Sequence, residues 1–294
     1  MKRFTLILIT LSLLLASCTG NTSDTSENTA VNDTTASTDK SESTVTDHVS
    51  DTVGDSIQTE KNETTSPETE EDITIEIPEF KSDLSEYEKY MQPEDRDGYL
   101  ILVNKDNPLP DDYVPEGMVD VVDTRDDGRD MQKMCLYASK ALEAMLIEAR
   151  ANGCKKLSVT SAYRSYDYQY RLYNQYIDKE MSRHPSWSRE QAIAEVNTYS
   201  AIAGTSEHQT GLACDMHNLS SAKVEFADTP ESEWLENNCY KFGFILRYEE
   251  DKMDITGGII YEPWHFRYVG RYHATRMHEL DMCLEEYLEY LNNN

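Results

Sequence analysis

The chain has 294 residues and a formal net charge of −28, and its length suits one domain with appendages. We exclude nucleic acid as a partner, because a protein that binds phosphates needs a basic surface. Aromatic and aliphatic residues are concentrated after residue 85, in a stretch of roughly 210 residues that is long enough for one buried core.

The first residues have the pattern of an export signal. A basic start precedes a mainly apolar segment, residues 4–16, which is shorter than the roughly 20 residues that span a bilayer. The run Leu15-Ala16-Ser17-Cys18 resembles the lipobox of bacterial lipoproteins. We therefore predict a lipoprotein signal peptide over residues 1–17 and lipidation of Cys18, which would anchor the chain to the extracytoplasmic face of the bacterial cell membrane. An ordinary signal peptide followed by a chance cysteine is the alternative.

Residues 18–85 are mostly Thr, Ser, Asp and Glu, with no aromatic residue before Phe80. Such a composition cannot bury enough apolar surface to offset the entropy lost on ordering. We predict a disordered, self-repelling tether. It would let a membrane-fixed domain, residues 86–294, reach into the cell wall.

The first half of this domain alternates between strand and helix patterns. The apolar run 99–103 and the alternating, partly β-branched run 156–163 predict strands. Apolar residues at helical spacing predict a helix over 130–152. Further helices are predicted over 167–179 and 188–199, the second with a good N-cap and a glutamine three residues later.

The second half has a similar mixture. Strands are predicted over 212–217, 244–248 and 264–269. A Thr-Pro start predicts a helix over 229–242, and the last twenty residues predict one acidic amphipathic helix. Helices and strands follow no regular βαβ repeat. This order indicates an α+β fold with a central, mostly antiparallel sheet flanked by helices.

Five cysteines remain once Cys18 is set aside, so at least one is unpaired within a monomer. No CxxC pair occurs, which argues against a Cys-rich zinc site. We expect most of them to be small buried hydrophobic residues. Cys214 precedes Asp215 on a predicted strand and should face the opposite side, into the core. The five are Cys135, Cys154, Cys214, Cys239 and Cys283.

Two histidines and an aspartate have the chemistry of a metal site. A catalytic zinc ion takes three nitrogen or oxygen ligands and leaves a fourth position for water. His208, Asp215 and His265 form such a set, and Gly211 permits a tight turn between His208 and the strand with Asp215. This ligand type favours zinc, and we predict one zinc ion per chain.

The neighbouring residues suit hydrolysis. Glu262 lies three residues before His265, and a carboxylate beside a zinc-bound water can take its proton and pass it to a leaving amine. Arg164 ends a predicted strand, and its guanidinium can bind a carboxylate or stabilise an oxyanion. Gln169 and Ser206 can add neutral hydrogen bonds. We assign Glu262 and Arg164 to catalysis, and Arg164, Gln169 and Ser206 to substrate binding.

Each of these residues, taken alone, has an ordinary structural interpretation. A single histidine is more often structural than a ligand, and an arginine near tyrosines usually stacks on the surface. His217 lies two residues after Asp215, on the same predicted face. It is either a partner of the metal ligands or a rival ligand.

Three patterns occur in order: Tyr163-Arg164-Ser165 with Gln169, Ser206-x-His208-x-x-Gly211-x-Ala213-x-Asp215, and Glu262-x-x-His265. Together they closely resemble the motifs of the VanY-type D-alanyl-D-alanine carboxypeptidases. This family belongs to a group of zinc peptidases that includes lysostaphin-like enzymes and the hedgehog signalling domain. The resemblance covers roughly residues 99–290, nearly the whole predicted domain.

The resemblance implies a hedgehog/D-Ala-D-Ala peptidase-like fold, with zinc held by His208, Asp215 and His265 and with Glu262 as the general base. It implies that a substrate's terminal carboxylate or scissile carbonyl lies near Arg164. The implied activity is removal of the C-terminal D-alanine of peptidoglycan stem peptides, and we expect a monomer.

Three other functions stay open. An L,D-carboxypeptidase would remove D-alanine from tetrapeptide stems by the same chemistry. A non-catalytic, zinc-stabilised wall-binding module would not need a base, so the presence of Glu262 argues against it. An endopeptidase acting on cross-links would not need an arginine for a free carboxylate, which argues weakly against this function.

Overall fold

The computed structural model describes residue 76 and residues 78–294. The predicted signal peptide, Cys18 and most of the predicted tether lie outside the described residues. The end of the predicted tether packs on the domain: Leu84 is buried, and the backbone N–H groups of Lys81 and Ser82 donate hydrogen bonds to the buried Glu148 carboxylate. The folded part therefore begins before the predicted boundary at residue 86.

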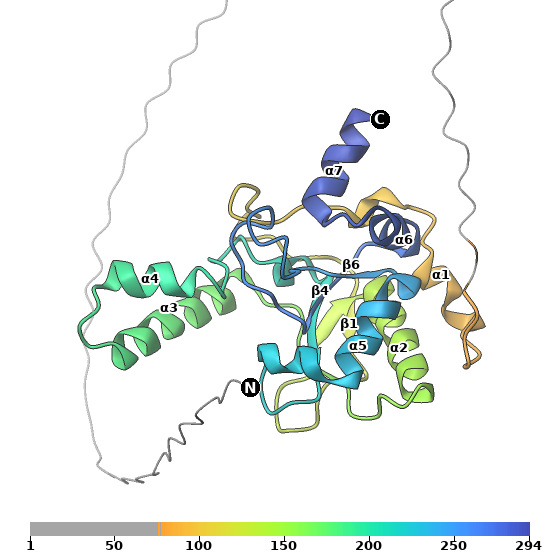
Figure 1. Ribbon diagram of the computed structural model, residues 1–294, viewed down its shortest axis with the longest axis horizontal. Helices are drawn as coiled ribbons and strands as arrows, with labels where there is room; N and C mark the ends of the chain where they lie inside the picture. The colour runs from red at the N-terminus through yellow and green to blue at the C-terminus, as the bar shows by residue number, and fades with distance from the viewer. Residues whose placement is uncertain (1–75, 77) are drawn as a thin grey trace, which may run out of the picture. The chain divides into compact units, whose positions relative to one another are not determined.

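A four-stranded antiparallel sheet forms the centre of the domain (Figure 1). Its strands lie in the order β3 (Ser158–Ser161), β4 (Ala213–His217), β6 (His265–Tyr268) and β5 (Phe244–Leu246). A separate antiparallel pair is formed by β1 (Met118–Asp120) and β2 (Lys133–Cys135). Helices flank the central sheet, which confirms the predicted α+β class with a mostly antiparallel sheet.

The two faces of the central sheet differ because successive side chains of a strand point to opposite sides. Cys214 and Met216 of β4 and Phe266 of β6 belong to the main hydrophobic core, together with the buried face of α2 (Leu136–Ala151). The core position predicted for Cys214 is confirmed. Asp215 and His265 alternate with these residues and face the other side of the sheet.

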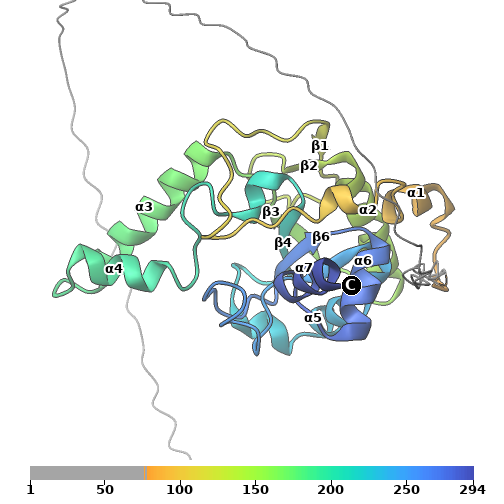
Figure 2. The same cartoon turned by 90° about the horizontal axis from the view of Figure 1, so that it is seen from above.

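The helices α3 (Tyr166–Arg183) and α4 (Arg189–Val196) form a hairpin that projects from the sheet (Figure 2). Ser188 accepts a hydrogen bond from the backbone of Gln191 and its own backbone donates to the Gln191 side chain, which is the predicted capping box. The two helices share a small core of their own, built from Tyr173, Ile177, Ala192 and Val196.

The C-terminal region differs from the prediction of one final helix. It forms two helices, α6 (Arg271–Leu280) and α7 (Leu284–Asn293), because Asp281 adopts the left-handed conformation with a φ of 54° and ends α6. α5 (Pro230–Asn238) begins at its predicted Thr-Pro start. The remaining helical segments are α1 (Glu88–Met91), η1 (Ser85–Tyr87), η2 (Asp97–Tyr99), η3 (Glu207–Thr210), η4 (Val224–Asp228) and η5 (Cys239–Phe242).

Two predictions near the start of the domain were wrong. Residues 99–103 form no strand, and the carbonyl groups of Tyr99 and Ile101 accept hydrogen bonds from the Arg267 guanidinium instead. The helix predicted over 130–152 begins only at Leu136, because the residues before it pair with β1. Within the described part of the chain, no helix has the length and apolar character needed to cross a membrane.

Candidate metal centre

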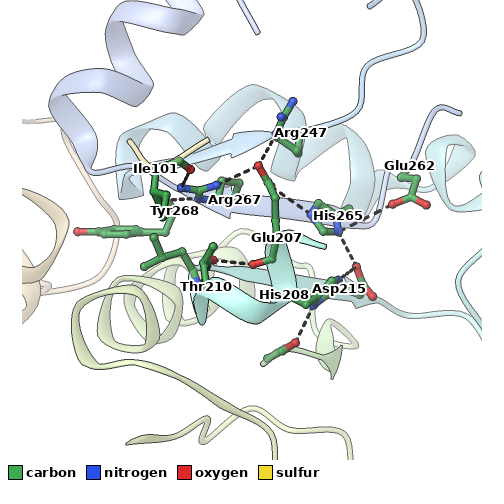
Figure 3. Close-up of polar contacts among 12 residues, drawn as sticks. Ile101, Glu207, His208, Thr210, Asp215, Arg247, Glu262, His265, Arg267 and Tyr268 are labelled. Carbon is green, nitrogen blue, oxygen red and sulfur yellow. Dashed lines mark hydrogen bonds and ion pairs between the residues drawn. The ribbon is translucent and has the colours of Figure 1, made fainter. Parts of the chain in front are cut away.

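Three ionisable side chains meet on the face of the sheet opposite α2 (Figure 3). His208 comes from η3, Asp215 from β4 and His265 from β6, and one ligand atom from each lies within 4.8 Å of the others. Asp215 and His265 are direct partners in the antiparallel register of β4 and β6. The fold thus brings together all three residues of the predicted ligand set.

Gly211 allows His208 to approach the start of β4. It ends η3 with a φ of 69°, in the left-handed region. A Cβ atom at this position would lie 3.0 Å from Cys135 Sγ and 3.1 Å from Pro115 Cγ. Both the backbone conformation and the lack of space favour glycine here, as the predicted tight turn requires.

The two imidazole rings turn different nitrogens towards Asp215. His208 Nδ1 lies 2.7 Å from the Ala162 carbonyl oxygen, which can only accept, so this nitrogen carries the proton. His208 Nε2 lies 3.4 Å from Asp215 Oδ1, and His265 Nδ1 lies 3.0 Å from the same oxygen. Two nitrogens and one carboxylate oxygen therefore converge, a donor set that fits zinc with three protein ligands.

The charges at this point favour a cation. Burial lowers the pKa of His208 to about 4, so this imidazole is neutral and suited to ligation. Although burial opposes its ionisation, His208 and His265 hold the pKa of Asp215 well below its usual range. Burial also opposes a charge on His265, yet Asp215 and Glu207 raise the pKa of His265 to about 9. The carboxylates thus draw positive charge into the site.

Glu262 lies beside the ligand set. Its Oε2 atom is 3.8 Å from His265 Nδ1, and the backbone N–H of His265 donates a 3.0 Å hydrogen bond to its carbonyl oxygen. The side chain is almost buried, and burial is the main reason that the pKa of Glu262 rises to about 8. The carboxyl group can therefore hold a proton near neutral pH.

A cleft of about 790 Å³ opens in front of these residues and is lined by Arg164, Glu262 and His265. Arg164 Nη1 donates a 3.0 Å hydrogen bond to Ser161 Oγ and lies 3.8 Å from Asp215 Oδ2. The Nε atom of Arg164 is buried and has no hydrogen-bond partner among the described residues. The guanidinium is thus held in place by Ser161, and its Nε–H remains as a hydrogen-bond donor without a partner among the described residues.

The other two predicted substrate residues lie in different positions. Ser206 lines the cleft. Gln169 is buried behind its wall, where Nε2 donates a 2.6 Å hydrogen bond to the carbonyl oxygen of Ala201, a lining residue. Direct contact of Gln169 with substrate stays a prediction, while its observed contact supports the wall of the cleft.

His217 is not brought into the ligand set. Its Nδ1 lies 3.3 Å from the Arg125 guanidinium, and its ring packs edge-on against Phe226. Burial, with the charge of Arg125, lowers the pKa of His217 to about 4. Both neighbours indicate a neutral, structural histidine, so the rival-ligand interpretation is wrong for the site as folded.

Sequence reasoning missed a buried charge cluster next to the site. Glu207 forms ion pairs with Arg247 and Arg267, and all three side chains are fully buried. The available signal was an arginine inside each of two apolar strand runs, because a buried guanidinium needs a carboxylate partner. Tyr176 and Tyr248, which line the cleft, were missed as well.

Comparisons with known proteins identify the family to which this chain is similar. The family model for VanY, D-alanyl-D-alanine carboxypeptidase, matches residues 131–271. A D-alanyl-D-alanine carboxypeptidase of Enterococcus faecalis is 36% identical over 197 residues, which are 67% of this chain and 68% of that protein.

Two solved structures are similar in fold and sequence. The LdcB LD-carboxypeptidase has a TM-score of 0.56 and 35% identity, over 67% of this chain and 88% of that one. A mutant of the vancomycin resistance D,D-pentapeptidase VanY from a VanB-type resistance cassette, in complex with Zn(II), has a TM-score of 0.54 and 36% identity, over 65% of this chain and 98% of that one.

Proposed function

This chain belongs to the VanY family of D-alanyl-D-alanine carboxypeptidases, and we propose that it is a zinc carboxypeptidase that removes the C-terminal D-alanine of peptidoglycan stem peptides. The observation that carries the proposal is the convergence of His208, Asp215 and His265 beside Glu262, at the wall of one cleft. The name of the Enterococcus faecalis relative and the Zn(II) in the VanY structure support the same substrate and metal.

The ligand assignment follows the atoms that face one another. His208 Nε2, Asp215 Oδ1 and His265 Nδ1 would hold the ion. Zinc held there would polarise the scissile carbonyl and lower the pKa of a bound water to about 7. His208, Asp215 and His265 all line the cleft, which is where a peptide has to enter.

Glu262 is assigned as the base and then as the acid. Its carboxylate would take a proton from the attacking water and deliver it to the nitrogen of the departing D-alanine. A raised pKa suits a group that must hold this proton between two transfers. A positive charge at the ligand set would lower that pKa again, which favours the carboxylate before attack.

Arg164 is assigned to the terminal carboxylate of the substrate. Its guanidinium lines the cleft, is anchored through Ser161 and keeps a buried Nε without a partner among the described residues. Charge-assisted hydrogen bonds of this kind are strong and directional. The Ser206 hydroxyl can add a neutral bond, and Gln169 would support the wall through Ala201.

The stereochemistry before the scissile bond separates this proposal from its nearest rival. The LdcB LD-carboxypeptidase is about as similar to this chain as the VanY structure is. We would incubate the purified full chain, loaded with zinc, with a pentapeptide ending in D-Ala-D-Ala and a tetrapeptide ending in a single D-Ala. Mass spectrometry would follow loss of the last residue, with Glu262→Gln as the matched inactive control.

Each outcome of this assay has a clear meaning. Cleavage of the pentapeptide alone supports a D,D-carboxypeptidase, and cleavage of the tetrapeptide alone supports an L,D-carboxypeptidase. Cleavage of neither by a zinc-loaded chain would contradict both and favour a wall-binding module or an endopeptidase. We expect the first result.

We also propose that the enzyme acts as a monomer outside the cell, anchored to the membrane by lipid on Cys18. The support is the sequence Leu15-Ala16-Ser17-Cys18 behind a short apolar segment. A labelled fatty acid should be incorporated into the wild-type chain but not into Cys18→Ser. If both variants stay in the membrane fraction and neither is labelled, the anchor is something else.

A further inference from the structure

We propose that Glu207 is a positioning residue of the metal centre: it accepts a hydrogen bond from His265 Nε2 and so holds Nδ1 of the same ring towards the metal. The inference rests on the proposed function only in requiring that the ligand set binds a divalent cation. Glu207 itself stays out of the ligand set.

The first step is a difference between the two histidine ligands. The outer nitrogen of His208 has a partner, the Ala162 carbonyl oxygen at 2.7 Å. The outer nitrogen of His265, Nε2, is buried and has no hydrogen-bond partner among the described residues. A metal-ligating histidine almost always donates its outer N–H to an acceptor that fixes the ring, so His265 needs one.

The second step is the acceptor that faces this nitrogen. Oε2 of Glu207 lies 3.7 Å from His265 Nε2 and is likewise buried without a hydrogen-bond partner in the described chain. Figure 3 shows the Glu207 carboxylate directed at the imidazole, on the side away from Asp215. An approach of roughly 0.8 Å would give an ordinary N–H···O hydrogen bond that satisfies both atoms.

The third step is the restraint on the carboxylate. Oε1 of Glu207 accepts hydrogen bonds from Arg247 Nε at 2.8 Å and from Arg267 Nη1 at 2.9 Å. All three side chains are fully buried. Because two guanidinium groups occupy Oε1, Oε2 is the oxygen left for His265, and the carboxylate has a fixed orientation.

The arginines are themselves tied to distant parts of the chain. Arg267 Nη2 donates to the carbonyl oxygens of Tyr99 and Ile101, and Arg247 Nη2 donates to Glu285 of α7 at 2.7 Å. Two arginines and two glutamates balance in charge, so the cluster as a whole is neutral. The contact that links this cluster to the ligand set is the one between Glu207 Oε2 and His265 Nε2, and through it Glu207 orients the His265 ring.

Zinc affinity separates positioning from a purely structural role. A Glu207→Gln chain has a weaker acceptor for His265, and loss of such a partner typically weakens metal binding about 10–100-fold. Glu88→Gln is the matched control. Glu88 also pairs with a buried arginine, Arg271 on α6, but neither residue belongs to the ligand set. Both variants should unfold at lower temperature than the wild-type chain when stripped of zinc, but only Glu207→Gln should lose zinc affinity.

The measurement is competition with a chromogenic chelator on the purified full chain, beside thermal unfolding without metal. Equal zinc affinity of Glu207→Gln and the wild-type chain, with lowered stability, would overturn the positioning role. Failure of the wild-type chain to bind zinc would instead contradict the proposed function.

A second measurement needs no variant and covers the case in which Glu207→Gln does not fold. In the zinc-loaded wild-type chain with ¹⁵N-labelled histidine, NMR reports which ring nitrogen carries the proton. We expect opposite tautomers for the two ligands, with Nδ1–H in His208 and Nε2–H in His265. Two ligand histidines that are both protonated at Nδ1 would contradict the contact with Glu207.

Discussion

The two faces of the central sheet are built from the same four strands and have opposite chemistry. One face presents Cys214, Met216 and Phe266 to α2, and the other presents Asp215 and His265 to the cleft. Substitution on the first face should cost stability, while substitution on the second should cost turnover. Because successive residues of a strand face opposite sides, neighbouring positions on one strand serve stability and catalysis in turn.

The largest effect is expected on the cleft face, at Glu262. Replacement of this base by Gln keeps the shape but removes the proton acceptor, so kcat should fall by about 10²–10⁴-fold. Zinc content should stay at one ion per chain, because Glu262 is outside the ligand set. Turnover at the wild-type rate with zinc bound would show that another group is the base.

The apolar face should respond in the opposite way. Leu142 of α2 is fully buried in the main core, and Leu142→Ala should lower the free energy of unfolding by about 2–5 kcal/mol. The kcat of the remaining folded enzyme should not change. Denaturant unfolding measures the free energy of unfolding, and an activity assay at low temperature measures kcat. A large fall in kcat would contradict the separate roles of the two faces.

Arg164 tests how the cleft recognises its substrate. Arg164→Lys keeps the charge but loses the planar fork, and loss of a charged hydrogen bond worth about 1.5–3 kcal/mol should lower kcat/KM about 10–100-fold. A substrate whose terminal carboxylate is amidated should be cleaved equally poorly by both enzymes. If the variant is impaired as much on the amide as on the acid, Arg164 acts on the scissile carbonyl instead.

The smallest effect concerns Glu148, on the α2 side. Burial opposes its ionisation, but hydrogen bonds from Lys81, Ser82 and Asn152 hold the pKa of Glu148 below its usual value of 4.5. Because the pKa is lower in the folded state, the ionised carboxylate adds to the free energy of unfolding above pH 4.5. This contribution is lost as the pH falls through the folded-state pKa. The free energy of unfolding of Glu148→Gln should therefore be lower than that of the wild-type chain at pH 7, and the difference should shrink in acid. A difference that grows in acid would contradict this prediction.

The elements that follow local rules, including the apolar face of the sheet, were largely predictable. The strands of the central sheet, the Ser188 capping box and the core position of Cys214 all follow from spacing and residue type. The wrong predictions involve competition from elsewhere. Residues 99–103 have a strand pattern, yet Arg267, far away in sequence, takes two of their carbonyl groups.

The ligand set was predictable only as a set of residue types. Motif spacing identified His208, Asp215 and His265, but not which nitrogen of each ring faces the site. Glu207 was missed because its role depends on Arg247 and Arg267, which reach it through tertiary contacts. Likewise the Arg125 contact, which makes His217 structural, cannot be read from local sequence.

The central claim is that the cleft face works through one zinc ion held by His208, Asp215 and His265. Its most direct test is zinc titration into the chelator-stripped full chain, following release of D-alanine from the pentapeptide. We expect no turnover without metal and a linear rise that saturates at one zinc per chain. Full turnover by the stripped chain, or saturation at a different ratio, would contradict the claim.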